Sequence, residues 1–155
     1  MPQEYDIVIA DTSCFILLDK INELGILKNI FNNISTTPQV AAEFIKPLPE
    51  WVTIVAVIDT HYLQILETEV DSGEASAIAL AIEKGNALLL LDDDKARKLA
   101  SRLNLLFTGT LGVIKKAKEK NIIESVTGII NKIQQTNFRF SQKIANEILR
   151  EVGEL

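Results

Sequence analysis

Cysteine and histidine are almost absent from this 155-residue sequence, which has one of each. With Cys14 alone, no disulfide can form within the chain, and a reducing compartment, the cytoplasm, is the expected location. Beside the apolar Phe15 and Ile16, this thiol is predicted to be packed rather than reactive. A single His61 excludes a multi-histidine metal site and disfavours catalysis by a Ser-His-Asp or Cys-His arrangement. Any catalysis is therefore expected to depend on carboxylates.

Long apolar runs and an excess of positive charge are missing too. No segment approaches the ~20 apolar residues of a membrane span, and the acidic start, MPQEYDIVIAD, does not resemble a signal peptide. We therefore expect no membrane association. The formal net charge of −5 is the wrong sign for binding nucleic acid through Lys and Arg alone. That objection weakens if several acids share a metal-filled site, because the cation changes the local charge.

Apolar strands alternate with helical segments along the chain. The predicted strands are at 6–11, 33–36, 52–57, 88–91 and 103–107. Helix boundaries are marked by Thr37 and Pro38 at one start, by Pro47 at its end, and by Gly85 at the end of another. This order predicts an α/β fold with a mostly parallel sheet and helices on both faces. We expect residues 1–155 to form one domain, with the last helices, about 122–155, packed as a C-terminal extension.

Two of the predicted strands are followed directly by aspartate. Asp11 follows IVIA, and Asp92 follows LLLL, an uninterrupted apolar run that predicts a strand buried on both faces. In parallel sheets, ligands bind beyond the carboxyl ends of the strands. If these strands are neighbours, both aspartates lie at one edge of the sheet. Asp93 and Asp94 extend the second position to a triplet, and capping of the next helix explains only one of the three.

Two glutamates lie on otherwise apolar helix surfaces. Glu43 adjoins Phe44 three residues after Val40, and Glu74 is in the first turn of a helix that is apolar nearly all round. Each has an ordinary explanation: Glu43 as an edge charge with a packed stem, and Glu74 as an acid at the positive end of a helix dipole. Four acids at one edge would repel one another unless a cation intervened. Mg²⁺ prefers oxygen ligands and bridges to phosphate, so this set predicts metal-assisted phosphodiester cleavage.

Five segments resemble, in order and spacing, the motifs of PIN-domain proteins: IVIADTS, TPQVAAEF, SGEASAIALA, LLLLDDDKARKLA and FTGTLGVI. The nearest resemblance is to a PIN-like subfamily with a Gly-Glu-Ala motif, and FRFSQKIANEILREVGE is similar to its C-terminal end. The resemblance covers nearly the whole chain. It implies a three-layer α/β/α sandwich and a Mg²⁺- or Mn²⁺-dependent endoribonuclease acting on RNA. Many members of the family are toxins held by a small antitoxin protein, frequently as homodimers, and the resemblance implies such partners here.

The resemblance also assigns roles to the acids. Asp11 matches the first acid of the family, Glu43 the second, and Glu74 the third, where many members have aspartate. The fourth falls on Asp92 or Asp93, and the sequence leaves this choice open. All five acids are candidate catalytic residues. The expected metal ligands are Asp11, Glu74, Asp92 and Asp93.

Candidate substrate-binding residues lie beside these acids: Thr12, Ser13, Lys95, Arg97, Thr108 and Thr110. In the family, a hydroxyl after the first acid can hold a metal-bound water, which points to Thr12 or Ser13. The segment TGT can offer backbone N–H groups to a phosphate at a helix start, although an ordinary helix cap at Thr110 is equally consistent. The two basic residues are also explained by a solvated helix face.

Two other functions are consistent with parts of the sequence. The first is a catalytically inert PIN-like module that binds a partner protein or RNA, favoured by the low positive charge and by Glu74 in place of aspartate. The second is a receiver-type phosphoryl-transfer protein, which would group its acids after the first strand. Here only Asp11 follows that strand, which disfavours the receiver. Where the family usually has a basic residue after the fourth acid, this chain has Asp94, expected to cap the helix or to pair with Lys98.

Overall fold

Five parallel strands form the centre of the computed structural model, which describes residues 4–155 and leaves residues 1–3 of the predicted domain outside. The strands are β1 (Ile7–Ala10), β2 (Ile34–Thr36), β3 (Val52–Ile54), β4 (Ala87–Leu90) and β5 (Leu106–Thr108). Their order across the sheet is β3-β2-β1-β4-β5, with all neighbours parallel. Each strand predicted from the sequence is present, and β1 and β4 are neighbours at its centre.

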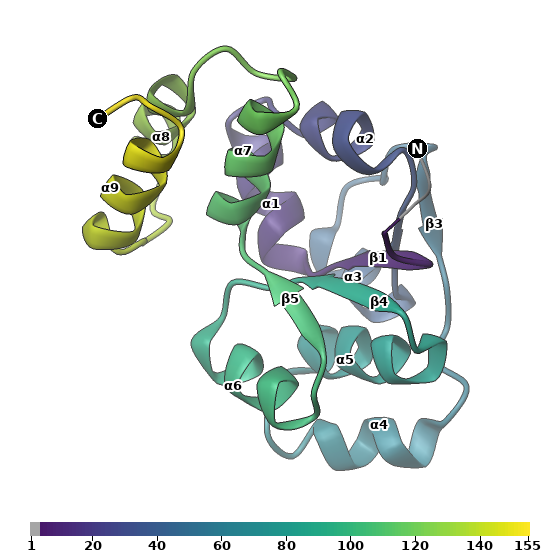
Figure 1. Cartoon of the computed structure of the whole chain (residues 1–155). Coiled ribbons are helices and arrows are strands. Elements are labelled where there is room, and N and C mark those ends of the chain that lie inside the picture. Colours follow the sequence, from purple (N-terminus) through teal and green to yellow (C-terminus); the bar gives the residue numbers. More distant parts are fainter. Residues whose placement is uncertain (1–3) are drawn as a thin grey trace.

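Helices cover both faces of this sheet (Figure 1). They are α1 (Thr12–Lys20), α2 (Gly25–Phe31), α3 (Pro38–Phe44), α4 (Thr60–Leu66), α5 (Ser72–Lys84), α6 (Asp94–Arg102), α7 (Thr110–Glu119), α8 (Val126–Gln134) and α9 (Gln142–Glu151). Helices α1, α2 and α7 lie over one face, and α4, α5 and α6 lie over the other. The result is the three-layer α/β/α sandwich that the sequence predicted.

The central strands are buried on both faces. Along β4, Leu88 and Leu90 belong to the apolar cluster on one side of the sheet, while Leu89 belongs to the cluster on the other side. Neighbouring β1 alternates in the same way, with Val8 in the first cluster and Ile9 in the second. Side chains alternate between the two faces of a strand, so an uninterrupted apolar run supplies both cores at once.

Local sequence sets the ends of helices α3 and α5. The Thr37 side chain accepts a hydrogen bond from the backbone N–H three residues later, and Pro38 begins α3. The helix ends at Phe44, before Pro47, because Ile45 has a φ of 71° and cannot continue it. Gly85 ends α5 with a φ of 86°, as the sequence predicted.

The chain closes with a helical pair at one end of the molecule. Helices α8 and α9 contact each other and α7, and buried Ile133, Ala145 and Ile148 join the apolar cluster that α7 also supplies. The segment between them, residues 135–141, turns back toward the carboxyl ends of the strands. Among residues 4–155, no helix is long and apolar enough to cross a membrane.

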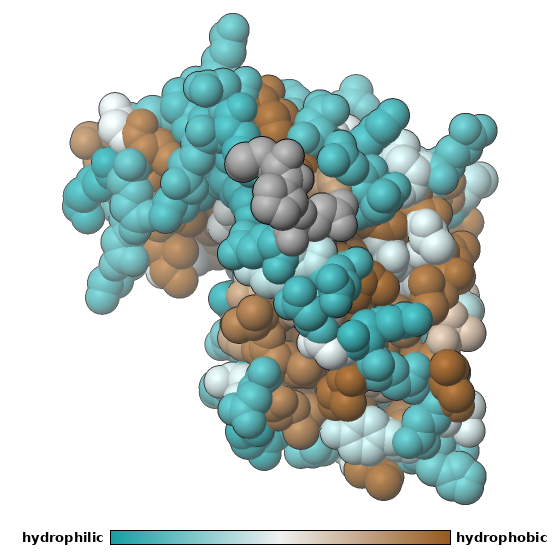
Figure 2. Space-filling model, turned by 45° about the vertical axis from the view of Figure 1, so that its right-hand side comes forward, coloured by the Kyte–Doolittle hydropathy of each residue, from teal (hydrophilic) through white to brown (hydrophobic). Residues whose placement is uncertain are grey.

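Some large apolar side chains remain on the surface near the edge strand β3. Ile54 is 52% exposed, Ile58 is 85% exposed, and Ile65 on α4 is 60% exposed. Figure 2 shows hydrophobic surface interspersed with hydrophilic surface on the side of the molecule that carries these elements.

Candidate active site

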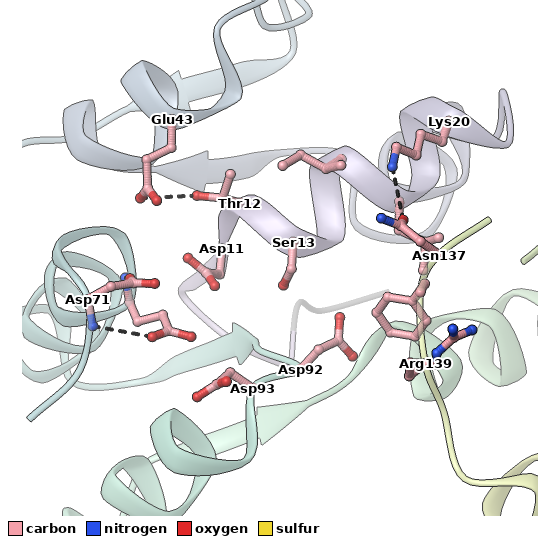
Figure 3. Close-up of a pocket in the computed structure, with 14 residues that line it drawn as sticks. Asp11, Thr12, Ser13, Lys20, Glu43, Asp71, Asp92, Asp93, Asn137 and Arg139 are labelled. Carbon is pink, nitrogen blue, oxygen red and sulfur yellow. Dashed lines mark hydrogen bonds between the residues drawn. The ribbon is translucent and has the colours of Figure 1, made fainter.

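A cavity of about 540 Å³ opens at the carboxyl edge of the sheet. Because β1 and β4 are parallel neighbours, the residues that follow them emerge side by side. Six carboxylates line this cavity: Asp11, Glu43, Asp71, Glu74, Asp92 and Asp93 (Figure 3). The structure thus brings together the five acids expected from the sequence, although they span more than eighty residues of chain, and it adds Asp71.

Asp11 is the most deeply buried acid of this cavity, with 4% of its surface exposed. Its Oδ1 atom is buried without a hydrogen-bond partner. Burial raises the pKa of Asp11 to about 7, the charges of Asp71 and Glu43 add to the rise, and a hydrogen bond from the Thr12 backbone N–H opposes it. A buried carboxylate with a free oxygen is costly, so it indicates a group that a cation or a proton must neutralise.

Glu43 reaches the cavity from α3 and is held by a hydroxyl of α1. The Thr12 Oγ1 atom donates a hydrogen bond to Glu43 Oε1 over 3.4 Å. Burial, together with the charge of Asp71, raises the pKa of Glu43. Gly73 makes room for this side chain, because a Cβ atom at that position would lie 1.8 Å from Glu43 Oε1. The glycine of the Gly-Glu-Ala motif is therefore required where two helices present acids to one cavity.

The start of α5 supplies two acids through one capping arrangement. The Asp71 side chain accepts a hydrogen bond from the Glu74 backbone N–H over 2.9 Å, and the Glu74 carboxylate accepts one from the Asp71 N–H over 3.4 Å. Burial raises the pKa of Glu74 to about 8, and the charges of Asp71 and Asp93 add to this rise. Glu74 is thus both an ordinary helix-terminal acid and a member of the cavity. Asp71 was missed, although its spacing in DSGE marks a capping box.

Asp92 accepts two hydrogen bonds from Thr110, the first residue of α7. The Thr110 backbone N–H donates to Asp92 Oδ1 over 2.8 Å, and the Thr110 hydroxyl donates to Oδ2 over 2.6 Å. Neither group of Thr110 is therefore offered outward to a phosphate, and Gly109, not Thr110, is the N-cap of α7. The cap role of Thr110 was wrong because Thr110 is the first residue inside α7, and its substrate-binding role gains no support because Asp92 accepts from both of its donors.

Asp93, and not Asp94 as the sequence predicted, caps α6. Asp93 caps α6, with Oδ2 accepting a hydrogen bond from the Ala96 N–H over 3.0 Å, and it also lines the cavity. Asp94 is inside the first turn of the helix, not at its cap, and forms no ion pair with Lys98 within the described residues 4–155.

The remaining predicted residues separate into two places. Ser13 lines the acidic cavity, and its hydroxyl oxygen is buried without a partner. Arg97 and Thr108 instead line a second cavity of about 570 Å³, next to the first. Lys95 is exposed and lines neither cavity. Its position in the chain beside the acids does not bring its side chain to them, because the helix turns it outward.

Two cations that sequence reasoning missed line the acidic cavity. Lys20 comes from the last turn of α1, and Arg139 comes from the segment between α8 and α9. Lys20 Nζ donates to Asn137 Oδ1 over 3.1 Å, which ties this segment to α1. No local pattern marked either residue. Arg139 belongs to FRFS, the segment similar to the end of the PIN-like subfamily, and that was the only available indication.

The donor set suits a hard cation. The lining offers carboxylate and hydroxyl oxygens, including the unpartnered Asp11 Oδ1 and Ser13 Oγ. Within residues 4–155, no three His, Cys, Asp or Glu side chains are already arranged around a common point to hold a metal ion. Mg²⁺ usually keeps several waters and takes only one or two carboxylates directly. The residues therefore fit a hydrated divalent cation better than a fully protein-coordinated one.

Comparison with known proteins places this arrangement in a family. No curated protein matches the chain. A family model described as DUF3368, a PIN domain, matches residues 7–154. PIN domains are generally nucleases, and this match includes every acid that lines the cavity. The chain therefore belongs to the PIN-domain family.

Proposed function

We propose that this protein is a Mg²⁺- or Mn²⁺-dependent endoribonuclease. The observation that carries the proposal is the buried, unpartnered Asp11 oxygen within a cavity lined by six carboxylates at the carboxyl edge of the sheet. Such a concentration of negative charge repels itself and raises the pKa of its members, unless a cation offsets it. Family membership favours cleavage of a phosphodiester bond over other metal chemistry.

The residues that would hold the cation are Asp11, Glu74, Asp92 and Asp93, all of which line the cavity. A divalent cation supplies Lewis acidity and positive charge, which favour attack of water on a phosphodiester. Asp92 and Asp93, between which the sequence could not choose, both line the cavity but are held by different contacts. Thr110 orients both oxygens of Asp92, while Asp93 uses only Oδ2 to cap α6.

Glu43 is the proposed acceptor of the proton that the attacking water loses. Its side chain is more exposed than that of Asp11, it is oriented by Thr12, and its pKa is raised from the ordinary glutamate value. A raised pKa brings a carboxylate closer to neutral pH, where it accepts a proton more readily. The unpartnered hydroxyl of Ser13 faces the same cavity and is available to a water there.

Cleavage of a labelled RNA with Mg²⁺ or Mn²⁺, followed by gel electrophoresis, tests this function. The Asp11→Asn variant should lose activity by about 10³-fold or more, as expected when a central electrostatic group is removed. Asp6→Asn is the matched control, because Asp6 is exposed at the opposite end of β1. Full activity of Asp11→Asn, or undiminished cleavage by the wild type in EDTA, would exclude the proposed chemistry.

A catalytically inert PIN-like module that binds RNA or a protein is the second candidate. The observation that favours it is that no three acids within residues 4–155 already converge on a common point. Isothermal calorimetry with Mn²⁺ separates the two candidates. The nuclease should bind the ion at millimolar concentration or below and lose that binding in Asp11→Asn, whereas the inert module should give no binding heat in either form.

We further propose that the protein is the toxin of a toxin–antitoxin pair in the cytoplasm, in the PIN-like subfamily with a Gly-Glu-Ala motif. The support is the sequence resemblance, including Gly73, Glu74 and Ala75, together with membership of the PIN-domain family. Controlled expression should arrest growth, and Asp11→Asn should not. Co-expression of a small protein encoded beside it should restore growth, and light scattering of the purified chain tests the predicted homodimer.

A further inference from the structure

The segment between α8 and α9 forms one wall of the acidic cavity. Asn137, Phe138 and Arg139 line the cavity, far along the chain from the acids. The hydrogen bond from Lys20 to Asn137 fastens this wall to the end of α1. Phe138 is partly buried and packs against the main apolar cluster, so its ring is anchored while part of it stays accessible. The site therefore has an acidic side and a wall of different chemistry.

Positive charge in the acidic cavity is confined to the side formed by this wall and the end of α1. Within the described residues, Lys20 and Arg139 are the only cations that line the acidic cavity, against six carboxylates. Figure 3 shows Lys20, Asn137 and Arg139 on the side of the cavity away from Asp71. Arg139 is exposed and forms no ion pair within residues 4–155, so its charge is available to a ligand. Among the residues that line the acidic cavity, those on this side are the ones that attract a polyanion.

The same wall continues into the second cavity. Phe138 and Arg139 line both cavities, and Asp92 lies between the two. The second cavity adds Arg97 and the partly buried ring of Phe140. Arg97 is 5.0 Å from the centre of the Phe107 ring, and this cation–π contact holds its guanidinium near the cavity. A continuous path thus runs from the acids past Arg139 to Arg97, with aromatic rings along it.

We propose that this path binds single-stranded RNA, with Arg139 and Lys20 contacting the phosphate backbone and Phe138 stacking against a base next to the cleaved bond. The proposal rests on the ribonuclease function above, and what it adds is the assignment of residues that position the RNA strand. Alternation of cations with accessible aromatic rings is how proteins bind single strands, because every unstacked base offers a flat face to a ring. Each cavity has the volume of a small-ligand site, which is enough for a nucleotide.

Binding and cleavage of a short RNA of mixed sequence test this proposal. Fluorescence anisotropy in EDTA reports binding without turnover, and initial rates with Mn²⁺ report KM and kcat separately. Arg139→Ala should weaken binding about fivefold or more and raise KM similarly, with kcat changed less than about threefold. Loss of one phosphate contact should also lower the slope of log K against log salt by about 0.7.

Arg150→Ala is the matched control for the lost charge. Arg150 lies in the last turn of α9 and lines neither cavity, so its removal should change binding less than twofold. Phe138→Leu keeps the packing but removes the flat ring, and should weaken binding about tenfold, as expected for one stacked base. Phe138→Tyr keeps the ring and should restore the affinity, which separates stacking from a folding defect.

The outcomes distinguish this proposal from the ribonuclease function. If the wild type binds RNA but never cleaves it, while Arg139→Ala loses binding, the path stands and the catalytic proposal fails. If the wild type cleaves and Arg139→Ala behaves as Arg150→Ala does, the path is wrong and the catalysis stands. Unchanged RNA binding in Arg139→Ala would overturn the RNA path and would indicate that this wall contacts a protein partner instead. Equal affinity for duplex and single-stranded RNA would overturn the proposed stacking of Phe138 on a base.

Discussion

Replacing Asp11 by asparagine should stabilise the protein at alkaline pH while it abolishes catalysis. In the folded state, burial raises the pKa of Asp11 to about 7, against 3.8 for an unperturbed aspartate. Between these values the folded protein binds a proton that the unfolded chain has lost, so stability falls as the pH rises from about 4 to 7. Above pH 7 the whole penalty remains, because the folded carboxylate is then ionised without a partner for Oδ1.

The size of this effect follows from the two pKa values. Their difference corresponds to about 4 kcal/mol of lost stability at pH 8. Asparagine removes the charge but buries an amide whose N–H groups lack acceptors, which costs about 1–3 kcal/mol. The net expectation is a gain of about 1–3 kcal/mol at pH 8. For a chain of this length, that gain raises Tm by about 3–10 °C.

Thermal unfolding followed by circular dichroism, at pH 4 and at pH 8 in EDTA, measures this difference. At pH 4 the folded Asp11 is protonated, so the gain should vanish or change sign. Asp6→Asn, with its exposed side chain at the other end of β1, should change stability by less than about 0.5 kcal/mol at either pH. If Asp11→Asn is less stable than the wild type at pH 8, or is stabilised equally at pH 4 and pH 8, the conclusion that Asp11 is a buried carboxylate with a raised pKa is wrong.

Addition of Mn²⁺ extends the same measurement. A cation that binds only the folded state raises its stability in proportion to the logarithm of ion concentration. The Tm of the wild type should therefore rise with Mn²⁺ at pH 8, and that of Asp11→Asn should not. Equal responses in the two proteins would place the ion away from Asp11.

Three further substitutions test the geometry. Gly73→Ala should displace the Glu43 carboxylate and lower RNA cleavage about tenfold or more, yet change stability by less than about 1 kcal/mol, because only a flexible side-chain end must move. Thr110→Val removes the hydroxyl that donates to Asp92. It should lower the free energy of unfolding by about 1–3 kcal/mol and should also lower the rate of RNA cleavage. Leu89→Ala should destabilise the protein by about 2–5 kcal/mol in urea unfolding and leave the metal affinity of the folded fraction unchanged. Unaltered activity of Gly73→Ala or unaltered stability of Thr110→Val would contradict the contact assigned to that residue. A loss of stability below about 1 kcal/mol in Leu89→Ala would contradict its place in the core.

The sequence allowed prediction of the fold and of the acids for one physical reason. Apolar runs, prolines and glycines mark strands and helix ends locally, and parallel strands bring whatever follows them to a common edge. Asp11 and Asp92 needed only that rule, because each directly follows a buried strand. Glu43 and Glu74 needed in addition the observation that an acid on an apolar helix face is costly.

The missed residues depend on contacts that no local pattern records. Arg139 reaches the cavity because α8 and α9 fold back on α7, and Lys20 reaches it because Asn137 accepts its hydrogen bond. Asp71 was missed because its spacing to Glu74 marks only the start of α5 and does not indicate that its side chain also lines the cavity. Lys95 is exposed and lines neither cavity, because proximity in the chain to Asp93 does not bring a side chain of the first turn of α6 into the site.

The pairing of β1 with β4 has a consequence for synthesis of the chain. One edge of β1 pairs with the nearby β2, but on its other edge Ile7 to Ala10 pair with Ala87 to Leu90, so that edge stays open until more than half of the polypeptide has been synthesised. Contacts between such distant segments form slowly. A nascent chain therefore carries Asp11 in an incomplete site until Asp92 and Asp93, which line the same cavity, have also been synthesised.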